Sequence, residues 1–266
     1  MIDVSSKKRI VLKLGTSTLT HKTGKLNIRR MTNLVRILSD LHNAGKELLL
    51  VSSGAVGMGV GKLNLPERPK DTPSKQAAAA VGQCELMHIY DDMFSKYNVT
   101  VAQILLTRAT LTNERLPHVQ NTIGRLLEMG VIPIVNENDT VAIDELELEI
   151  GENDSLSATV AAAVGADLLI ILSDINGLYS ADPRTDANAQ VIREVRKIDA
   201  RIEQMAGGAG SALGSGGMAT KINAAKIATE AGVDMVIMNG ERPERIYDLL
   251  EGRSVGSYFK AERTRN

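Results

Sequence analysis

Short runs of Val, Ile and Leu alternate along the chain with longer amphipathic stretches. The apolar runs predict strands at residues 9–14, 47–52, 100–105, 131–135, 168–172 and 234–238. Such runs are typical of strands that are buried on both faces of a parallel sheet. Patterns with a helical period predict helices at residues 28–44, 73–96, 114–129, 154–164, 218–231 and 243–251. The alternation of the two kinds of element predicts an α/β fold with helices on both faces of a mainly parallel sheet.

Two segments depart from this alternation. Residues 140–151 alternate apolar and acidic side chains, which indicates an exposed hairpin or flap. Residues 206–217 are almost all Gly, Ala and Ser, which indicates a flexible loop. No linker, low-complexity tail or internal repeat calls for a second domain, so we expect one domain over residues 1–266.

Composition narrows the class of protein. The formal net charge of −1 and the absence of Trp give no footprint for nucleic acid or an anionic membrane. The single cysteine, Cys84, rules out an internal disulfide framework and fits a reducing compartment. The N-terminus shows no signal peptide and no apolar stretch reaches membrane-spanning length, so we expect a cytoplasmic protein.

Two clusters of unusual residues follow the first two predicted strands, where ligands bind in parallel α/β sheets. Lys13 interrupts an apolar strand, and burying it is costly unless an anion compensates the charge. A strand-end lysine that reaches solvent is the alternative. The second cluster, S-S-G-A-V-G at residues 52–57, offers backbone amides at a helix N-terminus and can form an anion nest.

Two further clusters are polar. Residues 136–139, N-E-N-D, directly follow a buried strand and can recognise an ammonium or other polar substrate, although an ordinary turn is the alternative. Residues 151–155, G-E-N-D-S, precede an Ala-rich helix. Simple N-capping by Asn153 or Asp154 is the alternative there.

The last cluster has two parts, S-D-I-N-G-L-Y at residues 173–179 and G-S-G-G-M-A-T-K at residues 214–221. The glycine-rich part runs into a predicted helix with Lys221 in its first turn. Such a loop can close over a nucleotide with the lysine against phosphate oxygens, although a disordered linker is the alternative.

The residue patterns that other kinds of active site require do not occur in the sequence. The glycines at 57, 59 and 61 have the wrong spacing for a dinucleotide motif, and no Walker A or G-x-S-x-G sequence occurs. The four histidines are scattered without metal-ligand spacing, and Cys84 lies in an Ala-rich helical stretch where we expect core packing. Glycine nests, two lysines and several carboxylates or amides remain. This set suits phosphoryl transfer, where catalysis is mainly positioning and charge neutralisation.

Taken together, the motifs V-L-K-L-G-T-S, V-S-S-G-A-V, S-K-Q-A-A-A-A-V-G-Q, L-L-T-R, P-I-V-N-E-N-D-T-V, G-E-N-D-S-L-S-A, L-S-D-I-N-G-L-Y-S-A-D-P-R and G-S-G-G-M-A-T-K resemble those of the glutamate 5-kinases in the amino acid kinase family. The resemblance runs in order from about Arg9 to Phe259. It implies a three-layer αβα sandwich around a mainly parallel sheet. It also implies ATP with Mg²⁺ as co-substrate and L-glutamyl 5-phosphate, the first intermediate of proline biosynthesis, as product.

The resemblance also implies residue roles. Lys13 and Lys221 would stabilise the transferring phosphoryl group, and Asp154 would hold the two lysines. Glutamate would be bound by Ser53, Asp139 and Asn153. The residues expected to bind ATP are Lys13, Ser173, Asp174, Ser215, Gly216, Gly217, Met218, Ala219, Thr220 and Lys221.

The resemblance leaves some properties open. Many family members continue into a C-terminal PUA domain, whereas this chain stops soon after Lys260, so we expect no PUA domain. Feedback inhibition by proline and a homo-oligomer are expected. A sibling kinase acting on N-acetylglutamate, aspartate, carbamate or a nucleoside monophosphate is one alternative, although Thr16 and Ser17 after Gly15 differ from what those relatives commonly have. A catalytically silent regulatory protein on the same fold is the other.

Overall fold

The structure is a computed structural model, and it describes residues 4–21, 25–112, 114–141, 153–206 and 217–262. The chain divides into two compact units. Unit 1 comprises Met1–Lys13 and Ile150–Asn266, and unit 2 comprises Leu14–Glu149. The expectation that the whole chain forms one domain stays a prediction.

Unit 2 contains three parallel strands and the helices that accompany them. Its strands are β2 (Glu47–Ser52), β3 (Val101–Leu106) and β4 (Ile132–Glu137). Its helical elements are α1 (Thr16–Leu19), α2 (Ile28–Asn43), α3 (Ala55–Lys62), α4 (Thr72–Ser95), η1 (Arg108–Leu111) and α5 (Leu116–Glu128). Strand β4 pairs in parallel with both β2 and β3, which places it in the middle of the three.

Unit 1 holds the remaining strands and helices. Its strands are β1 (Arg9–Leu14, whose last residue is assigned to unit 2), β5 (Leu168–Ser173), β6 (Glu194–Val195), β7 (Asp234–Asn239) and β8 (Ser257–Phe259). Its helices are α7 (Asn153–Ala163), α8 (Ala200–Ala206), α9 (Met218–Glu230) and α10 (Arg245–Leu250). Strands β5 and β7 are parallel, whereas β8 runs antiparallel to β7. Helices α7 and α9 pack against each other.

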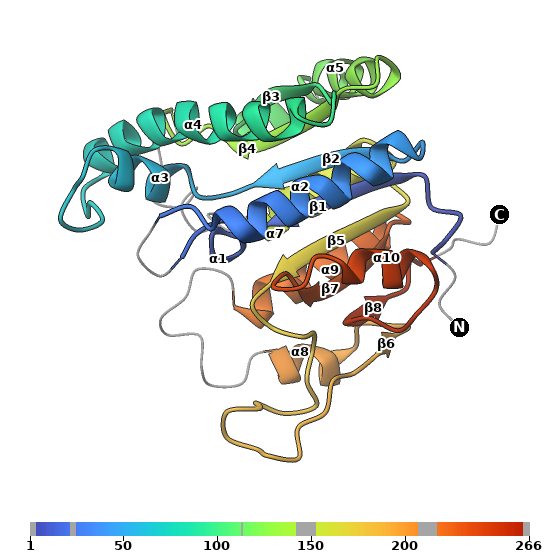
Figure 1. Ribbon diagram of the computed structural model, residues 1–266. Coiled ribbons are helices and arrows are strands. Elements are labelled where there is room, and N and C mark those ends of the chain that lie inside the picture. The colour runs from blue at the N-terminus through green and yellow to red at the C-terminus, as the bar shows by residue number, and fades with distance from the viewer. Residues whose placement is uncertain (1–3, 22–24, 113, 142–152, 207–216, 263–266) are drawn as a thin grey trace. The chain divides into compact units, whose positions relative to one another are not determined.

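The strands lie in the order β3-β4-β2 in unit 2 and β1-β5-β7-β8-β6 in unit 1 (Figure 1). Every residue of β5, and every residue of β1 and β2 after the first, is buried, as expected for strands with both faces covered. The predicted αβα fold around a mainly parallel sheet is confirmed. No helix in the part of the chain that the structure describes is long and apolar enough to cross a membrane.

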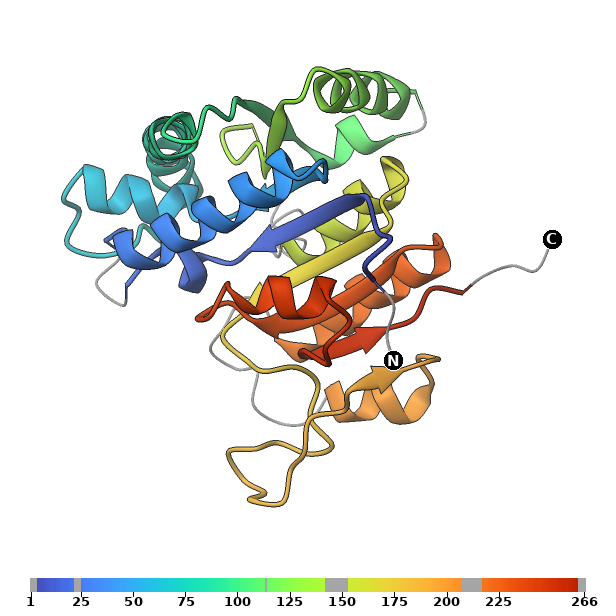
Figure 2. The ribbon, with the colours of Figure 1, turned by 45° about the vertical axis from the view of Figure 1, so that its right-hand side comes forward.

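Helices α3 and α4 lie side by side in unit 2, close enough for their backbones to touch (Figures 1 and 2). A Cβ on Gly59 of α3 would lie 1.8 Å from the carbonyl oxygen of Ala78, and a Cβ on Gly82 of α4 would lie 1.8 Å from that of Ala55. Only glycine permits this approach. Gly59, in the G-x-G-x-G stretch, therefore serves helix packing, which agrees with the rejection of a dinucleotide motif.

The six predicted strands are all present, and β1 and β2 have the predicted bounds. The apolar pattern did not predict β6 and β8, which have two and three residues and are too short to show a period. Most of the expected flap and glycine-rich loop, residues 142–152 and 207–216, lies outside the described residues.

The prediction that Cys84 packs in the core is wrong, because Cys84 is exposed. The buried face of α4 consists of Ala78, Ala79, Gly82, Gln83, Leu86, Tyr90 and Phe94. A helix turns by about 100° per residue, so the position after Gln83 leaves that face. The Ala-rich composition around the cysteine made the wrong face look apolar.

Candidate functional site

Three charged side chains are buried together in unit 1. Lys13 lies on β1, Asp154 in the first turn of α7 and Lys221 in the first turn of α9, with exposed fractions of 8%, 0% and 4%. The alternative in which Lys13 reaches solvent is therefore wrong. Charged groups are buried to this degree only when they are paired.

Asp154 bridges the two lysines. The Lys13 Nζ lies 2.7 Å from Asp154 Oδ1, and the Lys221 Nζ donates a hydrogen bond of 3.1 Å to Oδ2. The hydroxyl of Thr220 donates to the same Oδ2 at 3.3 Å. The Lys13 contact has the distance of an ion pair without hydrogen-bond alignment, so Oδ1 accepts no hydrogen bond from the described residues. The structure thus brings together the three residues expected to catalyse the reaction, whose catalytic roles stay predictions.

The electrostatics of this cluster favour an anion. Burial acts to raise the pKa of Asp154, but the charges of Lys13 and Lys221 outweigh it and hold that pKa below its ordinary value. Asp154 is therefore ionised at neutral pH, and the three side chains carry a net charge of +1. A fixed positive charge in a dry site can neutralise the oxygens of a phosphoryl group.

The expected nucleotide-binding residues flank this cluster along the chain. Ser173 ends β5, and its hydroxyl donates to the carboxylate of the exposed Asp174 at 3.1 Å. Gly217 is the N-cap of α9, and its carbonyl oxygen accepts a hydrogen bond of 2.8 Å from the Thr220 hydroxyl. Met218 and Ala219 begin α9. Ser215 and Gly216 lie outside the described residues.

Ser257 supports the loop after β5 and was not predicted from the sequence. Gly177 has a φ of +143°, and a Cβ there would lie 2.5 Å from the Ser257 hydroxyl oxygen. That hydroxyl accepts from the Leu178 amide at 2.8 Å and donates to the Ile192 carbonyl at 2.5 Å. The loop that carries Asp174 is thus tied to β8. A lone serine far along the chain gives no sequence signal of this contact.

Ser53 and Asp139, two of the expected glutamate-binding residues, belong to unit 2. Ser53 lies between β2 and Gly54, the N-cap of α3 with a φ of +98°. Asp139 is half-buried two residues after β4. Burial raises the pKa of Asp139, against a smaller lowering by the charge of Arg68. Asn153, the third expected residue, is the first residue of α7 in unit 1 and is also half-buried.

Helix α4 bonds to both strands that lead to these unit 2 residues. The buried hydroxyls of Tyr90 and Ser52 lie 2.9 Å apart. The Nδ2 of Asn136, on β4, donates a hydrogen bond of 2.8 Å to Gln83 Oε1. Gln83 lies within the motif S-K-Q-A-A-A-A-V-G-Q, but one polar residue in a helical pattern does not reveal its partner.

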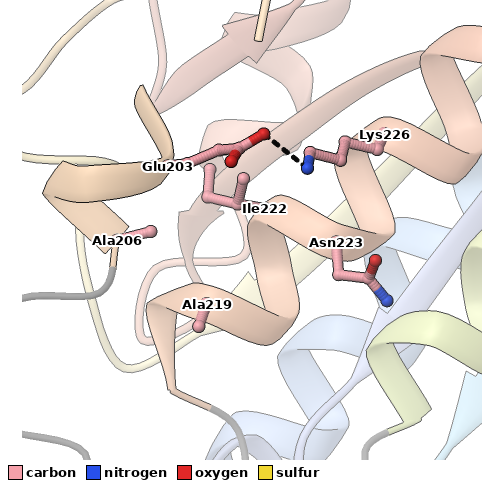
Figure 3. Close-up of a pocket in the computed structure, with 6 residues that line it drawn as sticks. All are labelled: Glu203, Ala206, Ala219, Ile222, Asn223 and Lys226. Atoms are coloured by element: carbon pink, nitrogen blue, oxygen red, sulfur yellow. Dashed lines mark ion pairs between the residues drawn. The ribbon is translucent and has the colours of Figure 1, made fainter. Parts of the chain in front are cut away.

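A pocket of about 200 Å³ lies between α8 and α9 in unit 1 (Figure 3). It is lined by Glu203, Ala206, Ala219, Ile222, Asn223 and Lys226. The Lys226 Nζ lies 2.5 Å from Glu203 Oε1, so the one cation lining the pocket already has a counter-charge (Figure 3). We therefore assign no phosphate to this pocket.

None of the described residues form a group of three or more His, Cys, Asp or Glu side chains that could hold a metal ion.

Comparisons with known proteins agree with the geometry. The sequence pattern of the "Amino acid kinase family" matches residues 8–239. The chain is 54% identical over 259 residues to a glutamate 5-kinase from Clostridium perfringens, which covers 96% of each chain. It is 52% identical over 254 residues to a glutamate 5-kinase from Carboxydothermus hydrogenoformans, which covers 95% of this chain and 68% of that one.

Solved structures show the same fold at low sequence identity. A UMP kinase from Bacillus anthracis superposes with a TM-score of 0.65 at 16% identity, over 97% of each chain. An isopentenyl phosphate kinase from T. acidophilum also gives a TM-score of 0.65 at 16% identity, over 95% of this chain and 100% of that one. Both are similar to this chain in fold.

Proposed function

The chain belongs to the amino acid kinase family, and we propose that it transfers the γ-phosphoryl group of ATP to the side-chain carboxylate of L-glutamate. The product would be L-glutamyl 5-phosphate, at the first step of proline biosynthesis. The observation that carries the proposal is the buried Lys13–Asp154–Lys221 cluster, in a chain that matches named glutamate 5-kinases over almost its whole length.

The reaction needs no general base. The side-chain carboxyl group of glutamate has an ordinary pKa of about 4.3, so it is ionised and nucleophilic at neutral pH. One of its oxygens would form the new bond to the γ-phosphorus while the bond from that phosphorus to the β–γ bridging oxygen breaks, which releases ADP. What the protein must supply is alignment and charge neutralisation.

Lys13 and Lys221 would supply that neutralisation. Both ammonium groups are buried and held by the same carboxylate, so their positions are fixed before ATP binds. Preorganised cations act most strongly where water is excluded. Asp154 would act as a positioning residue that orients the lysines.

Glutamate would be recognised by Ser53, Asp139 and Asn153. Asp139 is a partly desolvated carboxylate, and an α-ammonium group beside it would restore the stabilisation that burial removes. Ser53 and Asn153 would contribute hydrogen bonds to the carboxylates of the substrate. N-acetylglutamate lacks the ammonium group, so this interaction would favour free glutamate.

ATP would bind along Ser173, Asp174 and the segment that ends in Met218, Ala219, Thr220 and Lys221, with Ser215, Gly216 and Gly217 in the loop before it. We expect Mg²⁺ to enter with ATP, because Mg²⁺ is usually held by substrate phosphates with one or two carboxylates. We propose that the enzyme is cytoplasmic and forms a homo-oligomer. Proline would act as a feedback inhibitor that competes with glutamate, since it resembles a cyclised glutamate.

A hydroxylamine trap tests the activity. The protein is incubated with ATP, Mg²⁺, L-glutamate and hydroxylamine, and an acyl phosphate is converted to a coloured hydroxamate. We expect product with L-glutamate far above that with N-acetylglutamate, aspartate or carbamate. Faster reaction with N-acetylglutamate would overturn the choice of substrate, and ADP formation without any hydroxamate would overturn the choice of acceptor.

A further inference from the structure

Two polar side chains interrupt the otherwise apolar buried face of α4. Gln83 and Tyr90 are seven residues apart, which is two helical turns, so they share that face. Tyr90 bonds to Ser52 at the end of β2, and Gln83 bonds to Asn136 near the end of β4. Helix α4 therefore reaches both strand ends that lead to the expected glutamate-binding residues of unit 2.

The backbone amide of Glu137 favours one orientation of the Asn136 and Gln83 side-chain amides. Asn136 Oδ1 accepts a hydrogen bond of 2.9 Å from the Glu137 amide, which turns Asn136 Nδ2 toward Gln83. Gln83 must then present its oxygen to Asn136. Reversing the Asn136 amide would set its NH₂ group against the Glu137 N–H, and reversing the Gln83 amide alone would set two NH₂ groups against each other.

This arrangement leaves the other end of Gln83 unsatisfied. Gln83 is 8% exposed, and its Nε2 is buried without a hydrogen-bond partner among the described residues. An unpaired buried donor is unfavourable, and a leucine would fill a similar volume without one. Packing alone therefore does not explain a glutamine at this position. The hydrogen bond that Gln83 accepts from Asn136 explains why a glutamine stands there.

We propose that Gln83 is a positioning residue for glutamate binding: it fixes the Asn136 amide, and thereby the end of β4 from which the chain leads to Asp139. The residue after β4 is already tied to the end of β3 by backbone, because the Asn138 amide donates to the Leu106 carbonyl at 2.8 Å. Gln83 supplies the constraint from the α4 side. The inference rests on the proposed function, since it assigns the ligand of Asp139 as glutamate.

Two substitutions and a control test this role. Gln83→Leu removes the acceptor for Asn136 and also the unpaired donor. Its side chain fills a similar volume, so packing is preserved. Gln83→Glu keeps an oxygen that can accept from Asn136. Thr229→Val is the control, because it removes a buried hydrogen-bonding group elsewhere: the Thr229 hydroxyl donates to the Ala225 carbonyl at 2.8 Å in α9 of unit 1. The KM for glutamate, the KM for ATP and the thermal midpoint are measured for each variant and for the parent enzyme.

We expect Gln83→Leu to raise the KM for glutamate roughly three- to tenfold, the range that corresponds to one net hydrogen bond. The KM for ATP should change less than about twofold. Gln83→Glu should keep a KM for glutamate closer to that of the parent, and Thr229→Val should leave both KM values unchanged whatever it does to the thermal midpoint.

Three results would overturn the inference. One is an unchanged KM for glutamate in Gln83→Leu; another is a parallel rise in both KM values, which would indicate general destabilisation. The third is an equal rise in Gln83→Leu and Gln83→Glu. If Gln83→Leu does not fold, a KM for glutamate in Gln83→Glu that rises as far as the predicted three- to tenfold would also refute it. A parent enzyme that forms no glutamyl hydroxamate is a separate result, which refutes the proposed function and this inference together.

Discussion

Replacing Asp154 with Asn is the sharpest perturbation that the buried cluster offers. The side chain keeps its size and loses its charge. In the parent protein two buried positive charges each lie within ion-pair distance of the one negative charge, that of Asp154. In Asp154→Asn the two ammonium groups would face each other without a counter-charge.

The magnitude follows from the burial of the three side chains. Asp154 is 0% exposed, so solvent does not screen its interactions. Removing one partner of a buried ion pair typically costs about 3–5 kcal/mol. That is a large part of the about 5–15 kcal/mol by which a domain is stable. We expect Asp154→Asn to lower the free energy of unfolding by about that amount.

Lys221→Met provides the matched comparison. It leaves Lys13 and Asp154 as a pair with no net charge and fills most of the lysine volume with an apolar chain. Removing one partner of a buried ion pair is costly because it leaves a charge without compensation, and in Lys221→Met the Lys13–Asp154 pair leaves none. We therefore expect the free energy of unfolding to change by less than about 1.5 kcal/mol in Lys221→Met. The double variant Asp154→Asn/Lys221→Met keeps one uncompensated lysine, Lys13. Its free energy of unfolding should lie between those of the two single variants.

Urea unfolding without nucleotide measures these differences. The pH dependence gives a second measurement with a definite sign. Because the pKa of folded Asp154 is lowered, its stabilising contribution is complete above the ordinary value of about 4 and is lost as the pH falls through the folded pKa. The stability gap between the parent and Asp154→Asn should therefore narrow in acid. A gap below about 1 kcal/mol at pH 7 would refute the reasoning, as would a Lys221→Met variant less stable than Asp154→Asn.

Four further predictions concern turnover, substrate affinity, the charge of Asp139 and helix packing. Lys13→Ala and Lys221→Ala should each lower kcat by about 100- to 1,000-fold in the hydroxamate assay, and arginine should rescue poorly because a planar fork does not replace a compact ammonium group. Near-normal turnover in Lys13→Ala would contradict the scheme. Asp139→Ala should raise the KM for glutamate more than it lowers kcat. Asp139→Asn should raise the thermal midpoint at pH 7. Burial raises the pKa of Asp139, so its ionised carboxylate destabilises the folded state. An unchanged or lower midpoint would argue against this. Gly82→Ala should destabilise by about 1–3 kcal/mol or more, since its Cβ would lie 1.8 Å from a backbone oxygen, whereas Gly124→Ala in α5, with nothing within 4 Å, should stabilise by up to about 1 kcal/mol; equal effects would refute the packing argument.

The sequence predicted the central strands because burial on both faces leaves continuous apolar runs. It also made Lys13 stand out, since a lysine inside such a run demands a counter-charge. The local pattern did not identify the residue that supplies this counter-charge. Asp154 lies in another element, far along the chain, and only the family resemblance linked it to both lysines. The local sequence pattern indicates which residues are unusual. Which distant residues pair with them depends on the tertiary fold.

Features that depend on tertiary neighbours escaped the pattern. Strand β8 is a strand because its three residues pair with β7, and a segment of three residues is too short for the sequence pattern to predict this pairing. Gln83 looked like one polar position in an Ala-rich helix, yet its partner lies 53 residues away on β4. Cys84 was misplaced by composition, because a helix rich in alanine shows little contrast between its faces.

If Asp154 acts as proposed, the same two contacts serve both stability and catalysis. Without a ligand, its carboxylate offsets one of two buried positive charges, so the cluster keeps a net charge of +1 that an incoming phosphoryl group can neutralise. If Asp154 only stabilised the fold, removing it would lower the free energy of unfolding and leave turnover per folded molecule unchanged. If it also orients the lysines, Asp154→Asn must lose turnover in the folded fraction, because two repelling ammonium groups no longer hold the positions that phosphoryl transfer requires. Each lysine variant removes one cation from the site, whereas Asp154→Asn keeps both and misplaces them. A loss of kcat in Asp154→Asn as large as that in either lysine variant would therefore show that the position of the charges matters as much as their number.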